Sequence, residues 1–287
     1  MRTHDLTVFA TGHRFLEGLR WHDGRLWASD FFTKHVLTFE SDGSSRVVAE
    51  IPGTPSGLGF LGDGSTLVVS QADRTVQRIA LDGGVSIYAD LSGVAAGPAN
   101  DMIVSSAGHA YVGNFGFAPG EEDPKPTNLA HIDPRGGVAR VAGEVLFPNG
   151  MAITPDGVLL LAETYAHRIS AFDIAPDGTL SKHRVWAQLD DTLRPDGIAL
   201  DTDGGLWFGN VQTRGEDSGF YRVLKGGEIT DKVPVADSWA VDATFGGEEL
   251  DTLYMCCNTT TVEEFLDGRS TAFVATADVG RQGSKHI

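Results

Sequence analysis

Five polar side chains recur at matching places along the chain, each at the start of an apolar, strand-like run. They are Glu17, Ser56, Asn100, Asn149 and Asp196. Four of the five carry carboxylate or carboxamide oxygens, which are the ligands that hard divalent cations prefer. Carboxylates that face each other repel unless a cation or a proton lies between them. We therefore predict a metal site in which Glu17 and Asp196 supply charge and Asn149 a neutral oxygen.

A turn is the competing interpretation of two of these residues. Asn149 and Asp196 stand in the stretches FPNG and RPDG, and Asn-Gly and Asp-Gly pairs commonly form hairpin turns. Each of the two repeats, however, has a second such pair seven residues later, at Asp156-Gly157 and Asp203-Gly204. The later pair can form the hairpin, so the earlier one is free for another role.

The elements that must position these residues follow from a repeated unit. Five clear copies and a weaker sixth, near Ala240, recur at intervals of roughly 40–50 residues, a spacing typical of propeller blades. Each copy holds about four short strand-like runs separated by Gly-rich turns, and no long amphipathic helix interrupts them. The sequence predicts an all-β fold, a six-bladed β-propeller with four-stranded blades around a central channel, as one domain over residues 1–287. The first strand of each blade lines the channel, so the five polar residues meet on its axis.

Two features of the predicted ring stay open. Either DLTVFATG near the N-terminus or TAFVATADV near the C-terminus could supply the strand that closes it. The irregular stretch Asn114–Asn128 interrupts the third blade and is either a functional lid or a plain insertion.

The composition limits the kinds of binding partner that we expect. The net charge of −17 disfavours nucleic acid and anionic membranes, which long-range electrostatics would repel. Adjacent Cys256 and Cys257 lie in an apolar run and are expected to be buried strand residues rather than a disulfide framework. The sequence contains neither a C-x-x-C nor an H-E-x-x-H motif, so a dedicated zinc site is not expected. With no signal peptide or transmembrane run, we expect a cytoplasmic protein, a monomer or a weak homo-oligomer.

These motifs together resemble one known family. The stretches EGLRW, FPNG, AET, RPDG, FGG and TLY, spread over nearly the whole chain, are similar to the regucalcin/gluconolactonase (senescence marker protein) family. The resemblance implies a six-bladed propeller with one divalent metal on the axis, usually calcium, and hydrolysis of a lactone or ester. By position, Glu17, Asn149 and Asp196 match the family's metal ligands. Asn100 matches its residue that contacts the substrate or the metal-bound water.

From this we expect a metal-dependent lactonase or esterase that opens a cyclic ester with a metal-activated water. The cofactor would be one divalent ion, Ca²⁺ first and Zn²⁺, Mg²⁺ or Mn²⁺ as alternatives. Asp196 is the candidate catalytic residue, with Asp101 and His13 as other possible bases, and Asn100 and Asp101 are the candidate substrate-binding residues. A serine hydrolase is disfavoured because no G-x-S-x-G motif is present.

Two alternatives remain at this stage: a non-catalytic propeller that binds a small molecule or a protein around a structural metal, and a different metal-assisted reaction.

The substrate also stays open. Pro98 stands where sugar-lactone members of the family often carry an arginine, a multidentate donor suited to sugars. Six aromatic residues fall near the predicted mouth and would suit a more apolar lactone or ester; they are Phe15, Phe31, Phe115, Phe117, Phe147 and Trp239.

Overall fold

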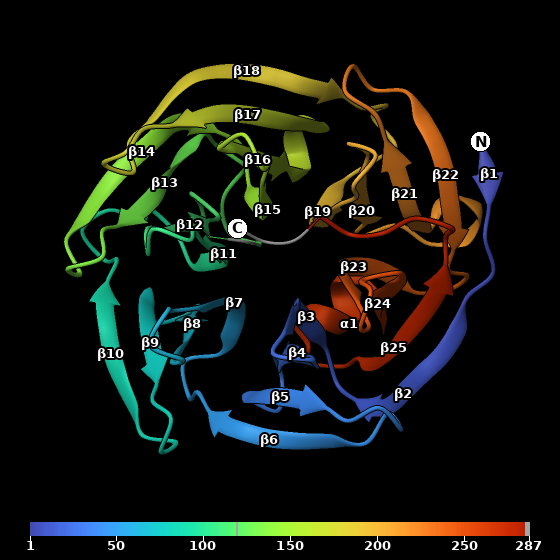
Figure 1. Ribbon diagram of the computed structural model, residues 1–287, viewed down its shortest axis with the longest axis horizontal. Helices are drawn as coiled ribbons and strands as arrows, with labels where there is room; N and C mark the ends of the chain where they lie inside the picture. Colours follow the sequence, from blue (N-terminus) through green and yellow to red (C-terminus); the bar gives the residue numbers. More distant parts are fainter. Residues whose placement is uncertain (119, 285–287) are drawn as a thin grey trace.

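The computed structural model describes residues 1–118 and 120–284, and it forms a ring of six sheets around an axis (Figure 1). Each sheet has an antiparallel four-stranded meander, and successive sheets follow one another around the ring. The predicted six-bladed all-β propeller is therefore confirmed. Glycines with positive φ, such as Gly157 at φ 79°, form the tight turns between strands. Within the described residues, no helix is long and apolar enough to cross a membrane.

The first three blades use consecutive strands from the channel outward. Blade 1 is β3 (Leu16–His22), β4 (Arg25–Asp30), β5 (His35–Phe39) and β6 (Ser45–Glu50). Blade 2 is β7 (Pro55–Phe60), β8 (Thr66–Ser70), β9 (Thr75–Ile79) and β10 (Val85–Asp90). Blade 3 is β11 (Ala99–Val104), β12 (Ala110–Asn114), β13 (Thr127–Ile132) and β14 (Val138–Val145).

The next two blades carry short additions. Blade 4 is β15 (Pro148–Ile153), β16 (Val158–Glu163), β17 (Arg168–Ile174) and β18 (Leu180–Gln188), with a 3-10 turn at Thr164–Ala166. Blade 5 is β19 (Pro195–Leu200), β20 (Leu206–Asn210), β21 (Gly219–Val223) and β22 (Ile229–Pro234), with a 3-10 turn at Gly215–Asp217. Strand β1 (Arg2–Thr3) runs parallel to β22 on its outer edge.

Blade 6 closes the ring with strands from both parts of the chain. Its inner strands are β23 (Trp239–Gly246), β24 (Thr252–Thr259) and β25 (Thr271–Asp278), and helix α1 (Val262–Leu266) lies between the last two. Strand β2 (Thr7–His13) is the outermost and pairs with β25. Both candidate closing segments are thus used: the C-terminal one as third strand and the N-terminal one as fourth.

The core consists of apolar layers between neighbouring blades. One buried cluster fills each of the six blade interfaces in the described chain. Cys256 and Cys257 are buried and unbridged, as expected, and face two different layers because successive residues of a strand point to opposite sides. This packing of sheet against sheet holds the innermost strands in a fixed position around the axis.

Candidate functional site

A break in strand pairing accompanies the site position in every blade. The pairing of the innermost strand with its neighbour shifts after Glu17, Pro55, Ala99, Pro148, Pro195 and Ala240. Such β-bulges bend a strand and redirect a side chain, and they are common beside active sites. Here they direct one residue per blade toward the same end of the axis.

In four blades a glycine follows the site residue and packs tightly against the next innermost strand. A β-carbon at Gly150 would lie 2.5 Å from the backbone oxygen of Asp196, and one at Gly18 would lie 2.6 Å from that of Ser56. Gly18 also has φ 60°, in the left-handed region. The Pro-x-Gly frames are therefore packing devices, which set one polar side chain per blade against the next blade.

These side chains form the polar floor of an axial cavity of about 520 Å³. Glu17, Asn100, Asn149 and Asp196 all line it, and Val241 occupies the corresponding place in blade 6. The structure thus brings together the three residues predicted to bind metal and one of the two predicted to bind substrate.

Glu17 is held by a hydrogen bond from the neighbouring blade. The Ser56 hydroxyl donates to Glu17 Oε2 at 2.6 Å. Loss of water around the carboxyl raises the pKa of Glu17 to about 8; the Ser56 bond opposes this shift, while the charges of Asp101 and Asp242 add to it.

Asp196 has a raised pKa for similar reasons. Burial is the main cause, and the negative charges of Asp242, Glu17 and Asp101 add to it. Among the described residues, no hydrogen bond reaches its carboxylate oxygens. The group is therefore available to an external partner.

The two carboxamides on the floor present oxygens rather than nitrogens. Asn149 Nδ2 donates to the Thr164 hydroxyl at 3.2 Å, and that hydroxyl itself donates to the Pro195 carbonyl at 2.8 Å. Asn100 Nδ2 donates to the Pro148 carbonyl at 3.1 Å. Because both nitrogens are used, both Oδ1 atoms are left for a ligand.

Below the floor, one arginine bridges two further acids. Arg20 on β3 contacts Asp101 Oδ1 at 2.6 Å and Asp242 Oδ2 at 3.1 Å, and its Nη2 also donates to the Met102 carbonyl. These acids occupy, in blades 3 and 6, the place of the glycine in the other blades. Burial raises the pKa of Asp242 to about 7 although Arg20 opposes the shift. Asp101 does not line the cavity; its carboxylate is paired with Arg20 instead.

The donor set fits a hard divalent cation. Four acids lie around the axis, Glu17, Asp101, Asp196 and Asp242, and Arg20 is the positive partner of two of them. This leaves Glu17 and Asp196 to be balanced by protons or by a cation, with the Asn149 oxygen beside them. No group of three or more His, Cys, Asp or Glu side chains in the described chain is arranged to hold a metal. A metal here would need the carboxamide as well.

Two aromatic walls rise from the floor on opposite sides of the ring. The first wall comes from blades 6 and 1 and consists of Phe15, Phe31, Trp239 and Phe265. The second wall comes from blades 3 and 4 and consists of Phe115, Phe117, Phe147 and Tyr165. All six aromatic residues that the sequence placed near the mouth line the cavity.

The insertion in blade 3 forms part of the second wall. Phe115, Phe117, Glu122 and Pro124 from this stretch line the cavity, and residue 119 lies outside the described residues. The stretch is thus a wall of the site. His13, in contrast, lies 3.8 Å from Asp30 and does not line the cavity.

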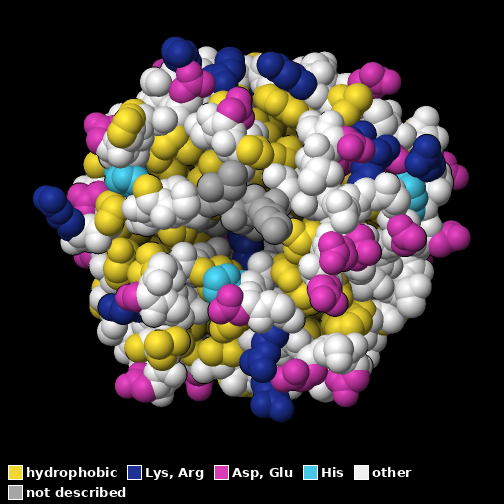
Figure 2. Space-filling model, viewed as in Figure 1, with side chains coloured by type: hydrophobic (Ala, Val, Ile, Leu, Met, Phe, Trp, Pro, Cys, Tyr) yellow, Lys and Arg dark blue, Asp and Glu magenta, His cyan; other side chains and the backbone are white. Residues whose placement is uncertain are grey.

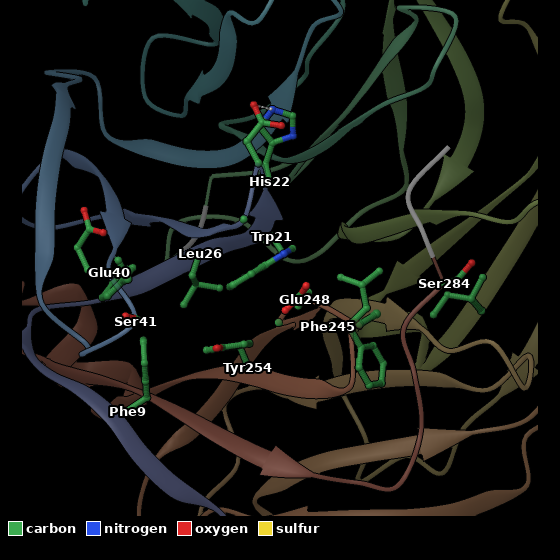
Figure 3. A pocket seen from close by; sticks show the side chains of 17 residues that line it. Phe9, Trp21, His22, Leu26, Glu40, Ser41, Phe245, Glu248, Tyr254 and Ser284 are labelled. Carbon is green, nitrogen blue, oxygen red and sulfur yellow. Dashed lines mark ion pairs between the residues drawn. The ribbon is translucent and has the colours of Figure 1, made fainter.

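A larger cavity lies at the other end of β3. It has a volume of about 950 Å³, and the side chains of Phe9, Trp21 and Tyr254 border it (Figure 3). The four polar floor residues do not line this space. Figure 2 shows that acidic and basic side chains mix on the visible face, with a basic side chain inside the central hollow. Because the four polar floor residues line the axial cavity and not this larger one, we place the candidate site at the mouth with the aromatic walls.

The fold and the floor define a class: six-bladed propellers with an oxygen-rich site on the axis. Comparison with known proteins is consistent with it, because residues 15–259 match the family model described as SMP-30/Gluconolactonase/LRE-like region. The chain belongs to this family.

Individual relatives are more distant. A 6-deoxy-6-sulfogluconolactonase of Pseudomonas putida is 27% identical over 160 residues, which cover 54% of this chain and 52% of the relative. The chain thus spans about half the length of this curated relative.

Solved structures of low identity share the fold. A luciferin-regenerating enzyme has a TM-score of 0.82 at 17% identity, covering 98% of both chains. A gluconolactonase from Xanthomonas campestris has a TM-score of 0.73 at 22% identity, covering 95% of this chain and 89% of that one. The calcium-binding protein regucalcin from Agrobacterium tumefaciens has a TM-score of 0.78 at 16% identity, covering 100% of this chain and 99% of that one.

Proposed function

We propose that the protein is a divalent-metal-dependent hydrolase that opens a lactone or ester at the axial site, with Ca²⁺ as the expected ion. One observation carries the proposal: two buried carboxyls with raised pKa values, Glu17 and Asp196, share a cavity floor with oriented carboxamide oxygens. Family membership supports it, as do relatives named as a sulfogluconolactonase and a gluconolactonase, and a neighbour described as calcium-binding.

The chain's residues divide the work in this proposal. Glu17, Asn149 and Asp196 would hold the cation, which when bound would polarise the substrate carbonyl. Ser56 orients Glu17, and Thr164 orients Asn149. In the hydrolysis, the oxygen of a water molecule bonds to the acyl carbon and the bond from that carbon to the ring oxygen breaks. A proton of the water ends on the ring oxygen, which gives a hydroxy acid.

Asp196 is the proposed catalytic residue because its carboxylate is free to accept a hydrogen bond from the attacking water and orient it. Asn100 is a proposed substrate-binding residue, since its Oδ1 faces the same cavity. Asp101 was predicted to bind substrate as well; in its paired position it would act by holding Arg20.

The test is lactone hydrolysis by metal-stripped protein before and after Ca²⁺, Mg²⁺, Mn²⁺ or Zn²⁺ is restored. We expect turnover only with metal, and an Asp196→Asn variant should lose about 100-fold or more in kcat/KM. Asp156→Asn is the control, because Asp156 lies in an exposed hairpin turn of the neighbouring blade. Tight metal binding without any turnover would instead favour a non-catalytic binding protein or another reaction.

A further inference from the structure

The described walls above the floor carry no cationic side chain. Among the described residues that line the cavity there is no Lys, Arg or His, whereas Glu17, Glu122 and Asp196 contribute carboxyls. With the carbonyl at the floor, a carboxylate, sulfonate or phosphate elsewhere on the substrate would lie against the walls and leave water without a cationic side chain beside it, which is costly. The lining therefore selects against an anionic substrate.

Three polar side chains of the walls, Tyr165, Gln212 and Glu122, are already paired. The Tyr165 hydroxyl and the Gln212 amide bond each other at 3.3–3.4 Å. Glu122 accepts from Lys125 and from the Ala118 backbone, both at 3.0 Å. Gln71 and the indole N–H of Trp239 are the other polar wall groups. They are too few for a sugar with several hydroxyls, which would have to break the existing pairs or leave some hydroxyls without partners. The walls suit a substrate with few polar groups.

Phe147 is held in an unfavourable backbone conformation. Its φ is 52°, a left-handed value that costs a bulky residue on the order of 1–3 kcal/mol. Its ring stacks on Phe115, with centroids 4.6 Å apart and 16° between the planes, and lies 4.7 Å from Tyr165. Glycine would relieve the backbone, so the phenyl ring at this half-buried place indicates a use in the cavity.

The apolar surface continues past the mouth onto α1. Val262 and Leu266 line the cavity and remain 53% and 61% exposed. Large apolar side chains exposed beside a cavity are typical of a binding surface. They would cover the part of a substrate that extends out of the cavity.

We propose that the substrate is an uncharged lactone or ester with an aromatic or alkyl body, held between the two aromatic walls with its carbonyl at the polar floor. This rests on the proposed hydrolase function and names its substrate class. The substrate buries apolar area against the walls, and its single carbonyl uses the oxygen-rich floor.

Three probes test the class with the metal-loaded protein: 3,4-dihydrocoumarin, a carboxylate-bearing dihydrocoumarin and glucono-1,5-lactone. We expect kcat/KM for dihydrocoumarin to exceed that for each of the others by about tenfold or more, which corresponds to about 1.4 kcal/mol. If the protein turns over glucono-1,5-lactone or the charged analogue faster than dihydrocoumarin, the proposed substrate class is wrong. The proposed hydrolase function would still hold.

Binding of the unreactive lactam analogue of dihydrocoumarin, followed by calorimetry, separates the two proposals. Lactam binding without turnover of any lactone would support the apolar site and refute the hydrolase. Neither binding nor turnover would refute both.

A variant pair isolates the second wall. Phe147→Gly removes the ring and relieves the backbone, so we expect KM for dihydrocoumarin to rise about fivefold or more, with a smaller change for glucono-1,5-lactone and no fall in Tm. Glu144→Gly is the matched control, because Glu144 is exposed, has φ 64° and lies three residues earlier, near the end of β14. Equal effects of both variants on all probes would contradict a role for the ring.

Discussion

At the scale of single residues, the site depends on a balance between acids and one guanidinium. Glu17 and Asp196 could be predicted from the sequence because each stands at the start of a repeated strand. Arg20 and Asp242 could not, since Arg20 lies inside an apolar strand and the sixth repeat is weak. One signal was present: Asp101 and Asp242 replace the glycine that follows the site residue in the other blades.

Arg20→Met is expected to destabilise the protein by about 3–5 kcal/mol, because it leaves Asp101 and Asp242 buried without a positive partner. Denaturant unfolding measures this. The double variant Arg20→Met/Asp242→Asn should recover part of the loss, since it removes one of the two uncompensated charges.

Arg78→Met serves as control. Arg78 forms an ion pair with exposed Asp63, so its loss should cost less than about 1 kcal/mol. Equal costs for Arg20→Met and Arg78→Met would show that the axial network adds nothing to stability.

At the scale of elements, the sequence predicts the innermost strands best, but it does not predict their β-bulges. Their number and start points follow from the repeat and its Asp-Gly turns. The β-bulges do not, because a bulge depends on pairing with a second strand rather than on local residue preference. Likewise, Phe15 and Phe147 could be placed near the mouth, but their assignment to two facing walls required the order of the blades around the ring.

Gly150→Ala tests the close approach of β15 and β19. An added methyl group would meet the backbone of Asp196, and backbone on both sides cannot move easily. We expect a loss of about 1–3 kcal/mol in stability and weaker Ca²⁺ binding, measured by unfolding and calorimetry.

Gly62→Ala is the control for this prediction, because a β-carbon there meets nothing within 4 Å. Normal Ca²⁺ affinity in a well-folded Gly150→Ala protein would argue that strand spacing does not set the metal site.

At the scale of the whole molecule, the acids on the axis link stability to pH. The pKa values of Glu17 and Asp242 are raised to about 8 and about 7, from 4.5 and 3.8. Between the ordinary and the raised pKa values, these two carboxyls bind more protons in the folded protein than in the unfolded chain, so their contribution to stability falls as pH rises. Metal-free protein should therefore lose several degrees of Tm between pH 5 and pH 8.

Calcium should reduce this loss of Tm, because a bound cation stabilises the ionised carboxylates that form as pH rises. Thermal unfolding with EDTA and with excess Ca²⁺ makes the comparison. A Tm that rises with pH in EDTA would contradict the assignment of raised pKa values.

The closure of blade 6 also sets an order of events during synthesis. Thr7 on β2 lies next to Thr276 on β25, which the ribosome adds 269 residues later. At about 5–20 residues per second, β2 waits roughly 15–50 s for its partner. The earlier blades are made first, but the ring cannot lock until β25 has been made. A nascent chain stalled before β25 emerges should therefore remain sensitive to protease at its N-terminus.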